Sequence, residues 1–193
     1  MRIIGGEHRG KQILPPKIFD ARPTTDFAKE GLFNTLTNIY DFETIAVLDL
    51  FSGTGGISYE FASRGCKNIT AIEMNNNHSK FIKATIAKLN LEGINIVRHN
   101  VFDFIKVCRL SFDVIFADPP YDIEGLAGIP NKILEQKLLN PGGVLVFEHP
   151  AALNFKDHPS FFKEKKYGNV HFSFFEPKAS ELLDNQITNQ LDT

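Results

Sequence analysis

The sequence predicts an α/β protein built on a mostly parallel sheet with helices on both of its faces. Three observations support this fold class. From residue 46 onward, short apolar runs typical of buried strands alternate with segments of helical periodicity. The first of these strands leads into a glycine-rich turn, as in many ligand-binding α/β sheets. After residue 150 the alternation stops, and two extended runs joined at Gly168-Asn169 predict a carboxyl-terminal antiparallel hairpin.

Each strand of the alternating region is predicted from an apolar run, and each helix from its spacing of apolar residues. Because a helix separates consecutive strands, we expect them to pair in parallel through right-handed crossovers. The predicted strands are residues 46–51, 68–73, 94–98, 112–117 and 144–148, and the predicted helices are residues 56–63, 76–90, 102–107 and 125–138. The carboxyl-terminal hairpin consists of residues 161–167 and 170–176.

A small unit is expected before this sheet. Two short apolar runs flank the glycine-rich stretch 5–10, which predicts an amino-terminal β-hairpin. Thr25 or Asp26 can then cap a helix, whose apolar residues at helical spacing are Phe27, Leu32, Leu36 and Ile39. We therefore divide the chain into a hairpin and loop over residues 1–25, a main domain over residues 26–176 and a polar tail over residues 177–193.

The charge of the chain is nearly balanced, with a formal net charge of −2. This balance excludes a global basic field, so any nucleic-acid site must be a local patch. The amino-terminal region offers such a patch, and its candidate phosphate contacts are Arg2, Arg9, Lys11, Arg22 and Lys29. An ordinary solvated basic face is the alternative interpretation.

Several other classes of protein are disfavoured. Cys66 and Cys108 lack C-x-x-C spacing, so we expect two small buried hydrophobes and neither a disulfide nor a zinc site. None of the six histidines has the spacing of a metal-ligand pair, so no metal is expected, although His149 ends a strand and could line a site. No apolar run approaches the length of a membrane span, and the amino terminus lacks the apolar region of a signal peptide. A cytoplasmic protein without membrane contact is therefore expected.

A nucleotide-type cofactor is indicated by the glycine-rich turn Gly53-Thr54-Gly55, which follows a strand and precedes a helix. With Ser58 in third position, it matches the dinucleotide fingerprint only in part. Glu73 lies twenty residues after Gly53, where a carboxylate can accept both ribose hydroxyls. Asp49 would repel a pyrophosphate but could pair with the ammonium of a methionine moiety. A generic glycine turn with two solvated acids is the alternative.

Two further strand ends carry polar groups. Asn100 and Val101 could read an adenine edge, although Asn100 is equally suited to cap the next helix. Asp118-Pro119-Pro120-Tyr121 ends an apolar strand, because neither proline can donate to a sheet ladder. A carboxylate, a rigid carbonyl and an aromatic ring suit the binding of an exocyclic amino group on a planar base. A strand-terminating turn with a solvated Asp is the alternative.

These motifs resemble class I S-adenosylmethionine (SAM)-dependent methyltransferases, and more narrowly the RsmD family of bacterial 16S ribosomal RNA guanine-N2 methyltransferases. The glycine motif and D-P-P-Y are shared by many methyltransferases. The stretches R-I-I-G-G-E-H-R-G, at residues 2–10, and R-P-T-T-D, at residues 22–26, are the family-specific part. The resemblance extends to about residue 176.

The resemblance implies a Rossmann-like methyltransferase sheet, SAM as cofactor and S-adenosyl-L-homocysteine as product. The implied target is a guanine of 16S rRNA, guanine 966 by the family's name, in the 30S subunit or an assembly intermediate. We expect a monomer. The residues implied to hold the cofactor are Asp49, Phe51, Ser52, Gly53, Thr54, Gly55, Glu73, Met74, Asn100 and Val101, and those implied to hold the target base are Asp118, Pro119, Pro120 and Tyr121.

Two other hypotheses remain open. A DNA adenine-N6 methyltransferase could use the same D-P-P-Y motif, although the chain has no room for a DNA-recognition domain. A SAM-binding or RNA-binding module without catalysis is the second, and the intact Asp118 argues against it. Asp49 and Ser58 disfavour an NAD-dependent dehydrogenase.

Overall fold

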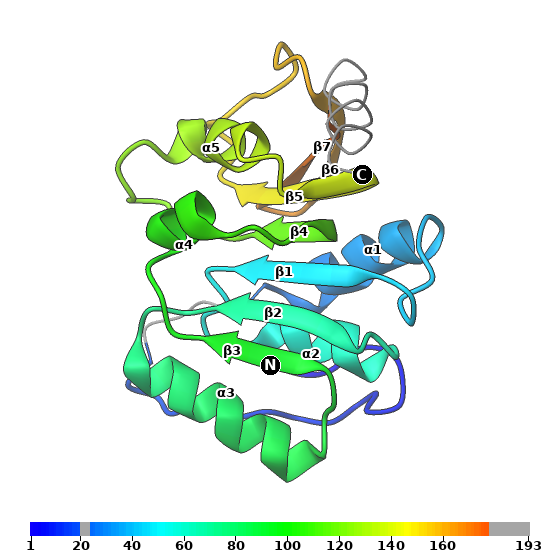
Figure 1. Cartoon of the computed structure of the whole chain (residues 1–193). Coiled ribbons are helices and arrows are strands. Elements are labelled where there is room, and N and C mark those ends of the chain that lie inside the picture. Colours follow the sequence, from blue (N-terminus) through cyan, green and yellow to red (C-terminus); the bar gives the residue numbers. More distant parts are fainter. Residues whose placement is uncertain (20–23, 178–193) are drawn as a thin grey trace, which may run out of the picture.

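The computed structural model describes residues 1–19 and 24–177 of the chain. These residues form one seven-stranded sheet with the strand order β3-β2-β1-β4-β5-β7-β6 (Figure 1). The first five strands in this order pair in parallel, and β7 pairs antiparallel with both β5 and β6. The predicted fold class, a mostly parallel sheet closed by a carboxyl-terminal antiparallel hairpin, is therefore confirmed.

The boundaries of most elements lie within a residue or two of those predicted. The strands are β1 (Ala46–Leu50), β2 (Asn68–Ile72), β3 (Ile94–Val97), β4 (Phe112–Ala117), β5 (Leu139–His149), β6 (Phe161–Tyr167) and β7 (Val170–Phe175). The helices are α1 (Asp26–Thr37), α2 (Gly56–Ser63), α3 (Asn76–Leu89), α4 (Val101–Val107) and α5 (Ile129–Glu135), with a short 3₁₀ helix at Leu126–Gly128.

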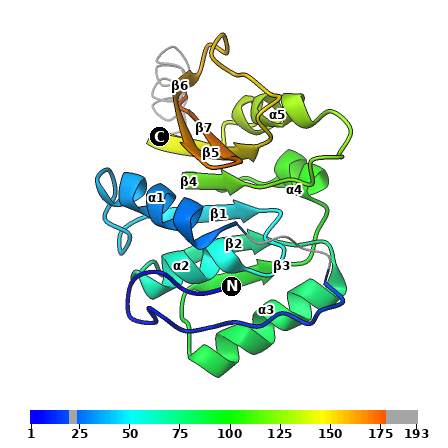
Figure 2. The ribbon, with the colours of Figure 1, turned by 180° about the vertical axis from the view of Figure 1, so that it is seen from behind.

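The core lies on both faces of the sheet because successive residues of a buried strand point to opposite sides. In β1, Val47 packs in one apolar cluster with α1 and α2, whereas Leu48 packs in a second cluster with α4 and α5. A third cluster joins Ile3 and Ile13 of the amino-terminal segment to Tyr59 of α2 and Ile82 of α3. Figure 2 shows this segment running over α2 and α3.

The amino-terminal hairpin is present with a single ladder bridge, between Arg2 and Gln12. Backbone hydrogen bonds from Ile3 to Lys11 and from Ile13 to Met1 hold its two sides together. Its tip turns at two glycines with positive φ, and the Glu7 N–H donates to the carbonyl of Ser63 in α2 at 2.7 Å. The hairpin is therefore fixed to the main sheet domain.

Three sequence expectations need correction. The buried stripe of α1 is Ala28, Lys29, Leu32, Phe33 and Leu36, whereas Phe27 and Ile39 are exposed. Helix α5 is shorter than the predicted helix 125–138, since its first part is a 3₁₀ turn. Strand β5 is longer than predicted, because it includes the Pro141–Gly143 segment as an irregular, register-shifted start.

Both cysteines are buried, as expected. Over residues 1–19 and 24–177, none of the helices combines the length and apolar character that crossing a bilayer requires. The expected polar tail lies outside the described residues apart from Pro177.

Candidate active site at the carboxyl edge of the sheet

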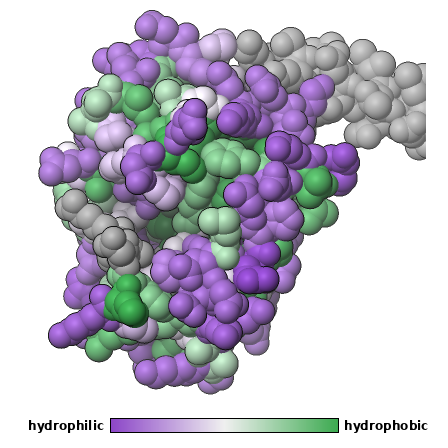
Figure 3. Space-filling model, turned by 90° about the vertical axis from the view of Figure 1, so that its left-hand side faces the viewer, coloured by the Kyte–Doolittle hydropathy of each residue, from purple (hydrophilic) through white to green (hydrophobic). Residues whose placement is uncertain are grey.

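The predicted site residues gather where the parallel strands end. In the register of the sheet, Leu50 of β1 lies between Ile72 of β2 and Ala117 of β4. Because the strands are parallel, the residues that follow, among them Glu73 and Asp118, leave the sheet at the same edge. Figure 3 views the molecule from this edge and shows an apolar hollow surrounded by hydrophilic side chains.

The glycine turn between β1 and α2 is built on positive backbone dihedral angles. Phe51, Gly53 and Gly55 have φ values of 61°, 54° and 86°. The turn is closed by a hydrogen bond from the Gly55 N–H to the Ser52 carbonyl at 2.7 Å and tied to β2 through the Ser52 N–H. A Cβ at Gly53 would meet no atom closer than 3.9 Å, so the space beside this residue is open. The backbone here can approach a ligand closely.

Asp49 is buried below this turn. One of its carboxylate oxygens accepts a hydrogen bond from the Ser58 hydroxyl at 2.5 Å. The pKa of Asp49 is raised to about 7, and burial is the main cause. Hydrogen bonds from Ser58 and Ser52 offset part of the rise, and the charge of Glu73 adds to it. Among the described residues, none forms an ion pair with Asp49. A buried carboxyl group without an ion-pair partner suits a bound ammonium.

Glu73 and Asn100 lie at the ends of β2 and β3 and both contact the start of a helix. Glu73 accepts from the Asn75 N–H at 2.6 Å. The Asn100 side-chain oxygen accepts from the N–H groups of Phe102 and Asp103, so the residue caps α4. Its amide nitrogen lies 3.8 Å from the Met74 sulfur, and Met74 is 64% exposed. The helix-capping interpretation of Asn100 is thus confirmed, and Val101 is buried behind it.

The Asp118–Tyr121 segment leaves β4 at the centre of the same edge. Pro119 is buried, whereas the Tyr121 side chain is 46% exposed. Burial raises the pKa of Asp118 well above its usual range, and the charges of Glu148 and Asp49 add to the effect. Three carboxyl groups thus lie near one another.

Glu148 is the site residue that our sequence analysis missed. It is the penultimate residue of β5, and its neighbour Phe147 pairs with Ala117 of β4. Glu148 therefore lies beside Asp118 near the end of β5, and it is only 5% exposed. The available signal was a charged residue ending the apolar run 144–147, the same pattern that identified Asp118.

His149, in contrast, does not line the site. It is fully buried, its Nε2 lies 2.8 Å from the Ser173 hydroxyl, and its ring stacks on Phe147. Its pKa is lowered, mainly by burial. The residue belongs to the packing between β5 and β7.

Of the predicted phosphate contacts, Arg2, Arg9 and Lys11 are exposed on the amino-terminal hairpin. Arg2 forms an ion pair with Asp26 at 3.1 Å, and Arg22 lies outside the described residues. The prediction for Lys29 was wrong, because this residue is 2% exposed and cannot reach a phosphate.

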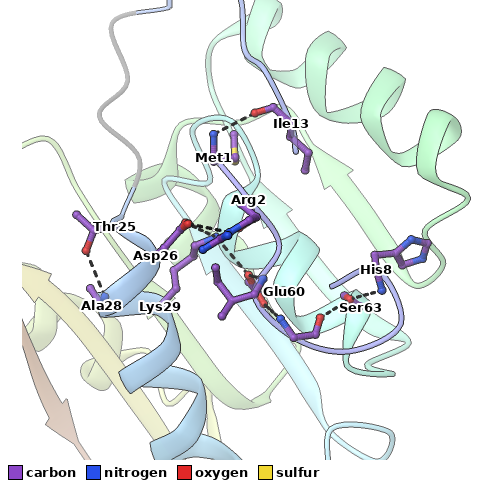
Figure 4. Close-up of polar contacts among 12 residues, drawn as sticks. Met1, Arg2, His8, Ile13, Thr25, Asp26, Ala28, Lys29, Glu60 and Ser63 are labelled. Atoms are coloured by element: carbon purple, nitrogen blue, oxygen red, sulfur yellow. Dashed lines mark hydrogen bonds and ion pairs between the residues drawn. The ribbon is translucent and has the colours of Figure 1, made fainter. Parts of the chain in front are cut away.

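Lys29 instead helps to fix the hairpin to the main domain (Figure 4). Its ammonium lies 3.2 Å from a carboxylate oxygen of Glu60 in α2 and donates to the Arg2 carbonyl. Glu60, which is fully buried, also accepts from the backbone N–H groups of Ile4 and Gly5. A buried ion pair thus holds the backbone that carries the exposed basic residues.

The chain is similar to known proteins over most of its length. The family described as Conserved hypothetical protein 95 matches residues 1–176. Ribosomal RNA small subunit methyltransferase D of Buchnera aphidicola subsp. Acyrthosiphon pisum is 33% identical over 191 residues, which cover 98% of this chain and 88% of the relative. The protein of the same name from Escherichia coli K12 is 28% identical over 182 residues, which cover 93% and 91%.

Solved structures share the fold. Hypothetical protein TTHA0928 from Thermus thermophilus has a TM-score of 0.81 at 28% identity and covers 91% of this chain and 99% of its own. T. thermophilus RsmC, a 16S rRNA N2 G1207 methyltransferase in complex with AdoMet and guanosine, has a TM-score of 0.66 at 19% identity and covers 84% of this chain and 46% of its own.

The sheet order, the glycine turn and the acidic strand ends define the fold of a class I SAM-dependent methyltransferase. Within that class, the family match over residues 1–176 and the similarity to the Buchnera protein decide the family. The chain belongs to the RsmD family, that of ribosomal RNA small subunit methyltransferase D.

Proposed function

We propose that this protein transfers the methyl group of SAM to the exocyclic N2 amino group of a guanine in 16S rRNA, with guanine 966 as the expected target. One observation carries the proposal: the Asp118 carboxyl group lies at the carboxyl edge of the sheet, beside the glycine turn and at the start of a rigid Pro-Pro segment. Membership of the RsmD family supports ribosomal RNA as the substrate, because the curated relatives carry that name.

The residues of the edge fit SAM. Asp49 would pair with the ammonium of the methionine part, and the open space beside Gly53 would admit its backbone. Glu73 would accept the ribose hydroxyls, and the Val101 backbone with the Asn100 amide nitrogen would face the adenine. The remaining cofactor contacts are expected from Phe51, Ser52, Thr54, Gly55 and Met74. When bound, SAM supplies an electrophilic methyl group on a sulfonium, which is an activated leaving group.

The chain's own contribution is to bind and orient the base. The N2 lone pair of guanine is delocalised into the ring, which makes the amino group a poor nucleophile. Acceptance of its hydrogens by the Asp118 carboxylate and the Pro119 carbonyl would localise the lone pair toward the methyl group, and Pro120 keeps this turn rigid. The exposed ring of Tyr121 would stack on the flipped base. N2 loses one proton on methylation, and the raised pKa of Asp118 suits it to accept that proton.

The amino-terminal unit, residues 1–25, is proposed to bind RNA. Arg2, Arg9 and Lys11 would contact phosphates, and Arg22 is assigned the same role from the sequence. We propose that residues 26–176 act as the methyltransferase domain and that the protein works as a cytoplasmic monomer on the 30S subunit or an assembly intermediate.

The proposal is tested by transfer of labelled methyl from SAM to unmodified 30S subunits, free 16S rRNA and duplex DNA, followed by digestion to nucleosides. Label in N2-methylguanosine is the expected result. Label only in N6-methyladenine of DNA would favour the DNA methyltransferase instead. Binding of SAM without any transfer would favour a non-catalytic module.

The role of Asp118 is tested separately with Asp118→Ala. We expect the rate of transfer to fall by about 10²–10³-fold, as when one donor or acceptor to a reacting group is removed, with SAM affinity nearly unchanged. Asp122→Ala, which removes an exposed carboxylate four residues into the same segment, is the matched control. An Asp118→Ala variant with normal transfer would show that the base lies elsewhere.

A further inference from the structure

Glu148 has no role in the proposed chemistry, yet it lies inside the proposed site. Its side chain is 5% exposed at the end of β5, next to the strand that ends in Asp118. Burial of a carboxyl group is costly unless polar partners compensate for the lost water. The residues around Glu148 therefore indicate what its position serves.

Two sequence motifs, R-P-T-T-D and D-P-P-Y, supply contacts to Glu148. One carboxylate oxygen accepts from the Thr24 hydroxyl at 3.1 Å. The other lies 3.5 Å from the Tyr121 hydroxyl, at the long limit for a hydrogen bond. Glu148 thus faces the ring expected to stack on the base. It is also close enough to Asp118 for its charge to contribute to the raised pKa of that residue.

Two neighbouring carboxyl groups match one edge of guanine and no edge of adenine. Guanine presents an N1–H donor directly beside its N2 amino group, so two acceptors can bind two adjacent donors. Adenine and cytosine present an unprotonated ring nitrogen beside their amino group. A carboxylate facing that nitrogen would oppose lone pair to lone pair, which costs binding energy.

We propose that Glu148 is the specificity-determining residue that accepts the N1–H of the target guanine, while Asp118 accepts a hydrogen of its N2 amino group. This assignment rests on the proposed function, since it concerns the same base in the same site. It also accounts for the placing of two mutually repelling carboxyl groups side by side. The guanine edge supplies the donors that relieve their repulsion.

The test uses 16S rRNA assembled by splinted ligation and reconstituted into 30S subunits. The nucleotide that the wild-type protein methylates is kept as guanine or replaced by 2-aminopurine, which retains the amino group but has no N1–H. We expect the wild-type protein to prefer guanine by about 10²-fold or more in kcat/KM, because a site built to accept a hydrogen bond rejects an analogue without it.

The variant Glu148→Gln then probes the residue itself. Its amide oxygen can still accept from Thr24 and Tyr121, but its NH₂ group can donate to the unprotonated N1 of 2-aminopurine. We expect kcat/KM for guanine to fall by about 10²-fold and the preference for guanine over 2-aminopurine to shrink or reverse. The charged groups facing Asp118 are Glu148 and Asp49. Loss of one of them should move the acid limb of the kcat/KM profile to lower pH.

Tyr121→Phe is the matched control, because it removes the hydroxyl contact with Glu148 and keeps the ring and the carboxylate. We expect it to keep the preference for guanine over 2-aminopurine. If it instead reproduces the loss of preference seen in Glu148→Gln, Glu148 only positions Tyr121 and the inference is wrong.

The two proposals can fail separately. If the wild-type protein forms no N2-methylguanosine, the proposed function fails. If it forms N2-methylguanosine but methylates 2-aminopurine equally well, only the role of Glu148 fails. This second outcome needs the wild-type protein alone, so it decides the question even if Glu148→Gln does not fold.

Discussion

The affinity for SAM should depend on pH through Asp49. In the free protein, burial raises the pKa of Asp49 to about 7, and no described residue pairs with its charge. An ammonium bound beside it would favour the ionised form and lower this pKa. Binding must then expel a proton from the fraction of protein in which Asp49 is protonated, so acid should weaken binding.

The size of the effect follows from the raised pKa. With a value of about 7 in the free protein and ionised Asp49 in the complex, the ratio of protonated to ionised free protein grows tenfold for each pH unit below 7. Between pH 8 and pH 6 the dissociation constant should therefore rise by about tenfold, and by about a further tenfold at pH 5.

Calorimetric titration with SAM in two buffers of different ionisation enthalpy measures both the affinity and the protons released. Asp49→Asn is the control, because it keeps the shape of the side chain and cannot titrate. Ser58→Ala removes a hydroxyl that lowers the pKa of Asp49, so its binding curve should shift to higher pH. If the wild-type protein and Asp49→Asn show the same pH dependence, Asp49 does not face the ammonium and the reasoning is refuted.

Three further predictions concern stability and the hairpin. Because the pKa of Asp49 is raised on folding, protonated Asp49 contributes to the free energy of unfolding; this contribution is complete below pH 4 and is lost as the pH rises to about 7. Urea unfolding of Asp49→Asn at several pH values should lack this pH-dependent loss of stability. Lys29→Met should cost about 3 kcal/mol, the low end for a broken buried ion pair, because Glu60 would keep only its longer 3.5 Å contact with Arg64. Lys106→Met at an exposed pair should cost at most about 1 kcal/mol, and equal costs in urea unfolding would contradict the anchoring role. Gly6→Ala should weaken 30S binding and lower the melting temperature, because its Cβ would lie 1.8 Å from the Ser63 carbonyl oxygen. Gly10→Ala is the control: Gly10 has a similar φ but nothing within 4 Å of its Cβ position, so this variant should affect stability by backbone strain alone. Comparable losses of 30S binding in the two variants would show that strain explains both.

The strand-end residues could be predicted because each interrupts or follows an apolar run. Asp49, Glu73 and Asp118 are recognisable in this way, and parallel pairing brings them to one edge without any knowledge of side-chain contacts. The same signal, a charged residue at the end of an apolar run, was present at Glu148. Its position beside Asp118 depends on strand β5 pairing with β4, which is a property of the sheet order.

Burial over long sequence distances could not be predicted. Lys29 appears in the sequence as one more basic residue near the amino terminus, and its partner Glu60 lies in a different helix. The helical periodicity of α1 also favoured Phe27 and Ile39, because spacing alone does not show which side of a helix contacts the sheet. The actual stripe includes the lysine because the ion pair compensates for its burial.

Helix α2 connects the two proposed binding regions. Its amino-terminal end is the glycine turn, and Ser58 in its first turn donates to Asp49. Further along the same helix, Glu60 and Ser63 hold the backbone of the amino-terminal hairpin. The hairpin therefore cannot change its position on the domain without losing its backbone hydrogen bonds to the buried Lys29–Glu60 pair or moving the helix that shapes the cofactor turn. This connection favours a surface for RNA that is already in place before RNA binds, with its geometry fixed relative to the base-binding edge.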